Sequence, residues 1–228
     1  MRIFRILTPA LLASLAACGS TYLHQTARTT MPPGAIAPLG VANPAAQPLL
    51  GKRIVVDPGH GGKDPGASAV DGSYEKDYNL RIAHLVARQL RDAGAEVLMT
   101  RSSDRFISLD ERAQLADQTR CDLFLSIHAD AASNPSARGA TLYRARGATG
   151  ASCGYGEEIL SALSRAGLAH RGLREAGFRV LMAHSRPSLL LECGFLTNAS
   201  DAANLNDPHW RDRISDAVCQ GVIAALGR

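Results

Sequence analysis

Apolar and polar residues follow two different rhythms along the chain, one typical of strands and the other of helices. Short runs rich in branched apolar residues, bounded by Gly, Pro or charged residues, predict strands. Such runs occupy residues 53–57, 96–100, 122–127, 140–143, 178–182 and 188–191. Stretches in which apolar residues recur every three or four positions predict helices at residues 76–93, 108–118, 157–166 and 207–226.

Two of the predicted helices begin with recognisable capping signals. Ser108 is followed three residues later by Glu111, which is the spacing of a capping box. Asp207 precedes Pro208, and proline is favoured at the first position of a helix. Strands that alternate with helices in this way favour a sheet covered by helices on both faces, so we expect a single α/β domain.

The N-terminus has the pattern of a bacterial export signal. Two arginines precede an apolar run over residues 6–17, which is too short to span a bilayer as a permanent helix. The run ends in Leu15-Ala16-Ala17-Cys18, which resembles the lipobox of bacterial lipoproteins. This resemblance implies a lipoprotein-type signal peptide at residues 1–17 and a membrane anchor on Cys18. The alternative is an ordinary signal peptide, cut after a small residue, in which Cys18 has no role.

The residues after Cys18 indicate where the protein goes and where its folded part begins. No Asp follows Cys18, and by the same resemblance this favours the outer membrane, with the protein in the periplasm. Residues 18–50 are rich in Pro, Ala, Gly and Thr without apolar periodicity, so we expect a flexible tether. The folded domain is then expected at residues 51–228.

Composition and charge exclude one class of partner. Charged residues make up 20% of the 228 residues, and the net charge is +4 without a dense run of Lys or Arg. Nucleic-acid-binding proteins usually show such a cluster, so we expect no nucleic-acid partner. A mildly basic surface is suited to work beside an anionic polymer.

Four cysteines lie in the expected domain, and the sequence leaves their pairing open. Cys121, Cys153, Cys193 and Cys219 lack the close spacing of a cysteine zinc site. An exported protein can form disulfides, and four cysteines allow three complete pairings. Buried free thiols are an equally good interpretation.

Three residues with metal-binding side chains follow predicted strands or open a predicted helix. His60 follows the first strand, His128 ends the third strand, and Glu75 opens the first long helix. The carboxyl ends of strands in an open α/β sheet line the ligand crevice, so these side chains are expected to converge. Two imidazoles and one carboxylate make a zinc-binding set that leaves one position open for water. Taken singly, they could be a turn histidine, a core histidine and a helix-dipole partner.

A fourth candidate, Glu192, ends the apolar run Leu189-Leu190-Leu191. A carboxylate in such a place is costly to bury unless it has a partner. Hydrolysis of an amide needs a group that moves protons as well as a metal, and a glutamate beside the metal could do this. The alternative for Glu192 is a structural ion pair.

Several motifs, taken in order, resemble those of one enzyme family. Residues 54–67, IVVDPGHGGKDPGA, are similar to the opening motif of the zinc-dependent N-acetylmuramoyl-L-alanine amidases, in the branch of the bacterial cell-separation amidases. The likeness extends from about residue 52 to the C-terminus. Later motifs resemble the family's in register at Glu75-Lys76-Asp77, Thr100-Arg101, residues 104–109, residues 126–129 and residues 192–198.

This resemblance implies a fold, a cofactor and a reaction. The fold would be a twisted, mostly parallel six-stranded sheet with helices on both faces. His60, Glu75 and His128 would bind Zn²⁺, and Glu192 would be the catalytic glutamate. The substrate would be peptidoglycan, cut at the amide between the lactyl group of N-acetylmuramic acid and L-alanine, in cell-wall remodelling or daughter-cell separation. The resemblance does not indicate whether an activator protein is needed.

The chain departs from the family pattern without losing a ligand. Asp130 stands where the family often has Asn, and Cys193 stands where it often has an aliphatic residue or Thr. Residues 183–186 replace a segment that is often similar to Asn-Thr-Lys. These departures leave the contacts with the substrate open. Arg138 or Arg186 could bind a peptide carboxylate, but each is a weaker candidate than the four site residues.

Two other functions are compatible with the sequence. A zinc peptidase that cuts within the stem peptide would use the same ligands and would differ only in its products. A lipoprotein that binds the cell wall without catalysis would be favoured by the loss of a ligand residue, but all four key residues are present.

Overall fold

A computed structural model describes residues 47–227 of the protein. The predicted signal peptide, Cys18 and most of the predicted tether lie outside the described residues. Leu49 is fully buried, and its N–H donates a hydrogen bond to the Ala93 carbonyl at 2.9 Å. The packed part of the chain therefore begins before residue 51, where the sequence pattern placed it. None of the described helices is both long and apolar enough to cross a membrane.

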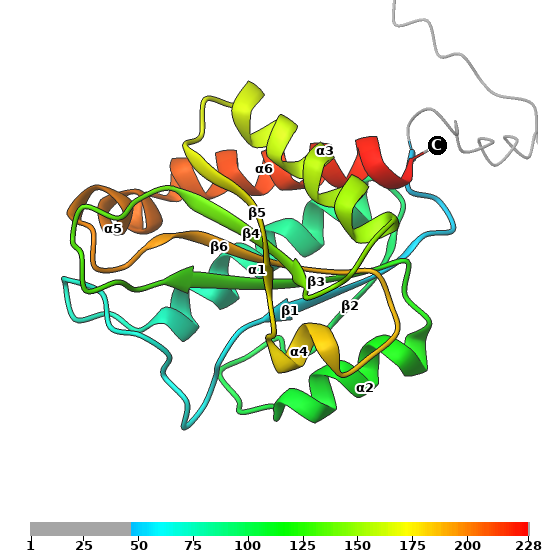
Figure 1. Cartoon of the computed structure of the whole chain (residues 1–228), viewed down its shortest axis with the longest axis horizontal. Helices are drawn as coiled ribbons and strands as arrows, with labels where there is room; N and C mark the ends of the chain where they lie inside the picture. The colour runs from blue at the N-terminus through cyan, green and yellow to red at the C-terminus, as the bar shows by residue number, and fades with distance from the viewer. Residues whose placement is uncertain (1–46, 228) are drawn as a thin grey trace, which may run out of the picture. The chain divides into compact units, whose positions relative to one another are not determined.

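Six strands form one sheet in the described part of the chain (Figure 1). In sheet order they are β2 (Glu96–Met99), β1 (Arg53–Pro58), β3 (Leu123–Asp130), β6 (Ser188–Phe195), β4 (Ala140–Ala145) and β5 (His170–Ala176). All neighbouring strands are parallel except β4 and β6, which are antiparallel. The expected mostly parallel, six-stranded sheet is confirmed.

Helices cover both faces of this sheet, as expected (Figure 1). One face is covered by α1 (Glu75–Asp92), α3 (Ala151–Arg165) and α6 (Pro208–Leu226), and α6 packs against the other two. The other face is covered by α2 (Leu109–Thr119) and the short α4 (Arg179–Met182), which pack against each other. The remaining helix, α5 (Ala199–Asn206), follows β6 and leads into α6.

The alternation of side chains along the strands divides the core into two clusters. The larger cluster lies beneath α1, α3 and α6 and contains Leu125 and Leu189 from the central strands. The smaller cluster lies beneath α2 and α4 and contains Val55, Phe124 and Leu190. Further along the same strands, this second face changes from apolar to polar, and the candidate site lies there.

Both predicted helix caps form. The Ser108 side chain accepts a hydrogen bond from the Glu111 N–H, and the Glu111 carboxylate accepts one from the Ser108 N–H at 2.8 Å. The Asp207 side chain accepts a hydrogen bond from the His209 N–H, and Pro208 occupies the first position of α6. Local sequence signals are therefore sufficient to define these two helix starts.

One predicted strand is wrong. Within residues 178–182, Arg179–Met182 form the single turn α4, and the fifth strand lies earlier, at His170–Ala176. β5 lies at the edge of the sheet and carries several exposed polar residues, so it lacks the apolar run that marks the other strands. The apolar residues after it form one helical turn that buries Val180 and Leu181. The pattern also misses α5, whose eight residues are mostly small or polar.

Candidate metal centre and active site

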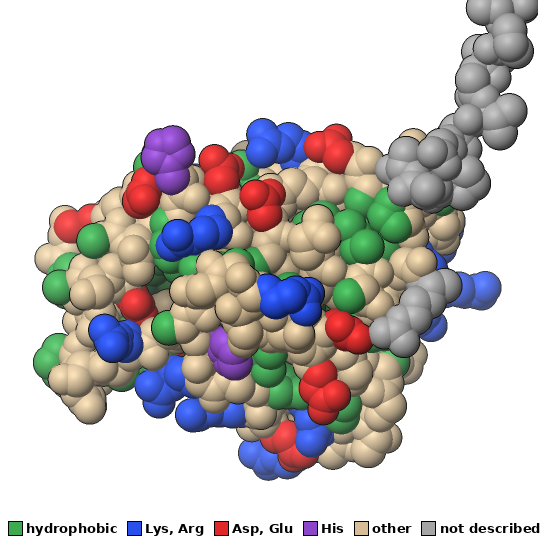
Figure 2. Space-filling model, turned by 90° about the horizontal axis from the view of Figure 1, so that it is seen from above, with side chains coloured by type: hydrophobic (Ala, Val, Ile, Leu, Met, Phe, Trp, Pro, Cys, Tyr) green, Lys and Arg blue, Asp and Glu red, His purple; other side chains and the backbone are tan. Residues whose placement is uncertain are grey.

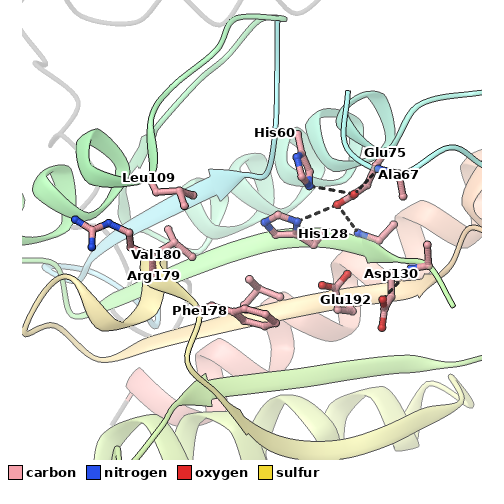
Figure 3. Close-up of a pocket in the computed structure, with 13 residues that line it drawn as sticks. His60, Ala67, Glu75, Leu109, His128, Asp130, Phe178, Arg179, Val180 and Glu192 are labelled. Carbon is pink, nitrogen blue, oxygen red and sulfur yellow. Dashed lines mark hydrogen bonds and ion pairs between the residues drawn. The ribbon is translucent and has the colours of Figure 1, made fainter. Parts of the chain in front are cut away.

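The four candidate residues meet at one edge of the sheet (Figure 3). His60 follows β1, and His128 lies near the end of β3. Glu192 lies in β6, and Glu75 is the first residue of α1. His128 and Glu192 are register partners in neighbouring strands, so their side chains project from the same face of the sheet. Ligands of open α/β sheets bind at this edge, where the carboxyl ends of parallel strands meet.

Two imidazoles and one carboxylate surround a single point. The Nε2 atom of His60 lies 3.1 Å from Glu75 Oε2, and the Nδ1 atom of His128 lies 2.9 Å from Glu75 Oε1. One donor atom from each residue lies within 4.8 Å of the other two. Ligands about 2.05 Å from a tetrahedral zinc ion are separated by about 3.3 Å, so these donors fit such an ion with little movement.

Neighbouring groups hold the three side chains in this arrangement. Asp64 Oδ2 lies 2.8 Å from His60 Nδ1, which leaves Nε2 to face Glu75. The buried Glu75 carboxylate accepts hydrogen bonds from two backbone N–H groups and from the side-chain amide of Asn79. Histidines that bind metals commonly have a second partner of this kind, which sets the tautomer and the ring orientation.

The charges of the cluster are coupled. Burial raises the pKa of Glu75, but the contacts with His128 and His60 outweigh it and hold that pKa well below its usual range. Burial lowers the pKa of His60, but Glu75 and Asp64 outweigh it and raise that pKa. An ionised carboxylate between two imidazoles is suited to a divalent cation, which would displace protons from the rings.

The turn that carries His60 requires unusual backbone geometry. His60 has a φ of 58°, in the left-handed region that residues other than Gly rarely adopt. A Cβ atom on Gly59 would lie 2.1 Å from the His128 ring, so only glycine lets the two histidines come this close. A Cβ atom on Gly66 would lie 2.5 Å from Glu75 Oε2. These contacts explain the glycines at positions 59 and 66, on either side of His60.

Two buried arginines hold this turn from behind. Arg101 and Arg112 donate hydrogen bonds of 2.6–3.0 Å to the backbone carbonyl oxygens of residues 58–60. Arg112 also pairs with the buried Asp57 carboxylate at 2.6 Å. The network satisfies the buried carbonyl groups and fixes the path of the chain into His60. Sequence reasoning missed the role of Arg112, because the residue lies in α2, far along the chain from the turn.

Glu192 faces the cluster across a pocket of about 380 Å³ (Figure 3). The residue is partly exposed, but its Oε2 atom is shielded from solvent and has no hydrogen-bond partner among the described residues. Burial, followed by the charges of Glu75 and Asp130, raises the pKa of Glu192 well above its usual value. A raised pKa makes a glutamate better able to accept a proton as well as to release one.

One wall of the pocket comes from the segment that the sequence pattern misassigned. Phe178 and Val180 from the α4 region, with Leu109 at the start of α2, form an apolar wall (Figure 3). Phe178 and Leu109 are 39% and 50% exposed, so both side chains remain available to a substrate. Arg179 and Asp130 add one charge of each sign to the lining.

The structure does not support the weaker carboxylate-binding candidates. Arg186 donates hydrogen bonds to the backbone carbonyl oxygens of Arg120 and Cys121, and it does not line the pocket. Arg138 is exposed and does not line the pocket either.

The four cysteines of the described residues are free thiols, so none of the three complete pairings forms there.

Comparison with known proteins assigns the chain to a family. Residues 54–224 match the family model described as N-acetylmuramoyl-L-alanine amidase. The N-acetylmuramoyl-L-alanine amidase LytC of Bacillus subtilis is 39% identical over 186 residues, which cover 81% of this chain but only 37% of LytC. The N-acetylmuramoyl-L-alanine amidase AmiA of Escherichia coli is 34% identical, and the match covers 81% of this chain and 80% of AmiA.

Solved structures agree with this assignment. The crystal structure of an N-acetylmuramoyl-L-alanine amidase from Clostridium difficile 630 matches with a TM-score of 0.74 and 34% identity. The match covers 77% of this chain and 96% of that one, so it takes in most of the described α/β domain. On the family model, the sequence identities and the shared fold together, the chain belongs to the N-acetylmuramoyl-L-alanine amidase family.

Proposed function

We propose that this protein hydrolyses the amide between the lactyl group of N-acetylmuramic acid and L-alanine in peptidoglycan, with zinc bound by His60, Glu75 and His128. Membership of the amidase family supports the reaction. The observation that carries the proposal is the convergence of these three donors and Glu192 on a single pocket. A lipoprotein that only bound the cell wall would have no need for this arrangement.

The donor set favours zinc over the other common divalent cations. Two imidazole nitrogens and one carboxylate are typical of catalytic zinc sites that keep one position open. Calcium and magnesium prefer oxygen ligands, and this cluster offers only one carboxylate. A zinc ion held here would polarise the scissile carbonyl and lower the pKa of a bound water.

Glu192 is assigned the proton transfers. Its carboxylate takes a proton from the attacking water, whose oxygen forms the new bond to the lactyl carbonyl carbon. It then gives that proton to the alanine nitrogen as the C–N bond breaks, because an unprotonated amide nitrogen is a poor leaving group. The raised pKa of Glu192 lets the carboxyl group hold the proton between the two steps. The products are a lactyl carboxylate on the glycan and a free amino group on L-alanine.

Mass spectrometry of the digestion products tests the reaction class. The full chain, incubated with purified peptidoglycan, should release peptides with a free N-terminal L-alanine and leave glycans with intact lactyl groups. Peptides cut within the stem would contradict the proposal and identify a zinc peptidase instead. The Glu192→Gln protein is the matched control and should release neither product.

We also propose that the enzyme acts in the periplasm, anchored to the outer membrane through a lipid on Cys18, in cell-wall remodelling or daughter-cell separation. The support is the segment Leu15-Ala16-Ala17-Cys18 without a following Asp. Labelled palmitate should enter the wild-type protein but not the Cys18→Ser protein. Equal labelling of the two, or none in either, would contradict the anchor without affecting the proposed reaction.

A further inference from the structure

Thr141 lies directly opposite the candidate proton carrier. It is in β4, which pairs with β6 in the antiparallel direction, and its register partner there is Glu192. Side chains of directly opposed residues project from the same face of the sheet, with Cβ atoms about 4.5–5.5 Å apart. Thr141 is 1% exposed, so its hydroxyl is removed from bulk water. The two side chains are therefore neighbours in a buried part of the active face.

Both of these side chains have an unpartnered oxygen. Thr141 Oγ1 and Glu192 Oε2 are buried and have no hydrogen-bond partner among the described residues. A buried polar group without a partner is destabilising, and valine has nearly the shape of threonine without the hydroxyl. A hydroxyl therefore gives this position no advantage for packing, whereas it gives Glu192 a hydrogen-bonding neighbour.

Among the described strands, Thr141 has a regular register partner only in β6. Ala140 and Leu142 pair with His170 and Leu173 of β5, so the register shifts and two residues of β5 lie opposite Thr141. Bulges of this kind are common beside active sites. Asp130, the other acidic residue that raises the pKa of Glu192, cannot donate a hydrogen bond when it is ionised.

We propose that Thr141 is a positioning residue for Glu192. Its hydroxyl donates a hydrogen bond to Glu192 Oε2 when the carboxylate is ionised, and rotation about the Thr141 Cα–Cβ bond brings the two oxygens within reach. When Glu192 holds the proton on Oε1, the same hydroxyl still donates to Oε2, because the unprotonated oxygen of a carboxyl group remains an acceptor. This contact keeps the other oxygen, Oε1, directed at the pocket through both proton transfers. The inference rests on the proposed function of Glu192.

Three variants of the full chain, purified in detergent, test this role. Thr141→Val removes the hydroxyl at nearly constant volume, and Thr141→Ser restores it without the methyl group. Ser215→Ala is the matched control, because Ser215 Oγ is also buried and unpartnered but lies in α6, on the opposite face of the sheet. Zinc content, melting temperature, kcat and KM are measured for each variant on a soluble muropeptide.

The expected result separates positioning from packing. Thr141→Val should keep its zinc, melt no lower than the wild type and keep KM within about twofold, while kcat falls about 10- to 100-fold, as for the loss of a hydrogen bond to a charged group. Thr141→Ser should recover most of this kcat, and Ser215→Ala should keep all of it. A merely structural Thr141 would affect the melting temperature instead, and valine would serve at least as well as serine.

Several outcomes would overturn the inference. Wild-type kcat in Thr141→Val is one, and a Thr141→Ser protein as slow as Thr141→Val is another. Parallel loss of zinc and kcat in Thr141→Val would show that the residue supports the metal site rather than Glu192. An inactive wild-type enzyme would overturn the proposed function and this inference together, whereas an active wild type with an equally active Thr141→Val protein would overturn this inference alone.

Discussion

The two faces of the central sheet are built from the same strands but differ in what they bury. Beneath α1, α3 and α6, the alternate residues of β3 at positions 123, 125, 127 and 129 are all apolar and buried. On the opposite face, β3 changes from Phe124 to Ser126 and His128 within five residues. Its neighbours present Asp57 and Glu192 beside these polar groups.

This difference assigns stability to one face of the sheet and function to the other. The apolar face gains free energy from burial alone, at about 25 cal/mol per Å² of apolar surface. The polar face has to satisfy the buried Asp57 carboxylate through Arg112 and buried carbonyl groups through Arg101, and it still leaves Glu192 and Thr141 with unpartnered oxygens. Buried polar residues with unpartnered oxygens are expected where chemistry rather than packing determines the sequence.

The largest effect on function is expected at Glu192. Glu192→Gln should lower kcat by about 10²- to 10⁴-fold, because general acid–base catalysis contributes that much to rates. The amide cannot accept a proton from water, but it fills the same space, so the fold should be unchanged. Steady-state kinetics on a soluble muropeptide measures this effect. A Glu192→Gln protein within tenfold of the wild type would remove Glu192 from the mechanism.

The apolar face should show the opposite behaviour. Leu125→Ala should lower the free energy of unfolding by about 2–5 kcal/mol, because it leaves a cavity in the larger core cluster. The fraction of molecules that stays folded should retain the wild-type kcat. Urea denaturation, combined with kinetics corrected for the folded fraction, measures both quantities. A large fall in kcat per folded molecule would show that the two faces are not separable.

Arg112 offers a test of the turn behind His60. Arg112→Lys keeps a positive charge for Asp57 but cannot reach the carbonyl groups of residues 58–60 with the same fork of donors. Loss of such supporting contacts typically weakens metal affinity by about 10- to 100-fold. Competition with a zinc chelator measures the affinity. Arg144→Lys, which alters a pair with Glu175 on β4 and β5, is the control and should bind zinc as the wild type does.

The smallest effect concerns pH. Because the folded metal-free protein raises the pKa of Glu192 above the value in the unfolded chain, the folded state binds that proton more tightly. Stability from this group is therefore present at low pH and declines as pH rises from about 4.5 towards the raised pKa. Metal-free Glu192→Gln, which cannot ionise, should gain stability relative to metal-free wild type as pH rises. Urea denaturation at pH 4.5 and 7.5 measures the free energy of unfolding of both metal-free proteins. The same difference between the two proteins at both pH values would contradict this prediction.

Sequence reasoning succeeds where a local pattern determines the structure. The apolar runs of β1, β3 and β6 define the central strands, and the rule that ligands lie at their carboxyl ends brings His60, His128 and Glu192 together. It fails where the structure depends on distant partners. Edge strand β5 has too few buried positions for an apolar run, and the five residues 178–182 fit a strand and a helical turn equally well.

The contacts that support the site could not be predicted from the sequence either. The hydrogen bonds of Arg112 to the turn join residues more than fifty positions apart. The pairing of Thr141 with Glu192 depends on the antiparallel placement of β4 beside β6, where a parallel neighbour was equally compatible with the pattern. Only the arrangement of α2 and of the strands in space, which local periodicity does not encode, reveals these relations.

The metal content of three proteins tests the central claim most directly, namely that three side chains bind the metal and a fourth only moves protons. Wild-type, Glu75→Gln and Glu192→Gln proteins would be analysed by inductively coupled plasma mass spectrometry after dialysis against a weak chelator. We predict one zinc ion per chain in the wild type and in Glu192→Gln, and almost none in Glu75→Gln. Zinc retained by Glu75→Gln, or lost from Glu192→Gln, would contradict this division of roles.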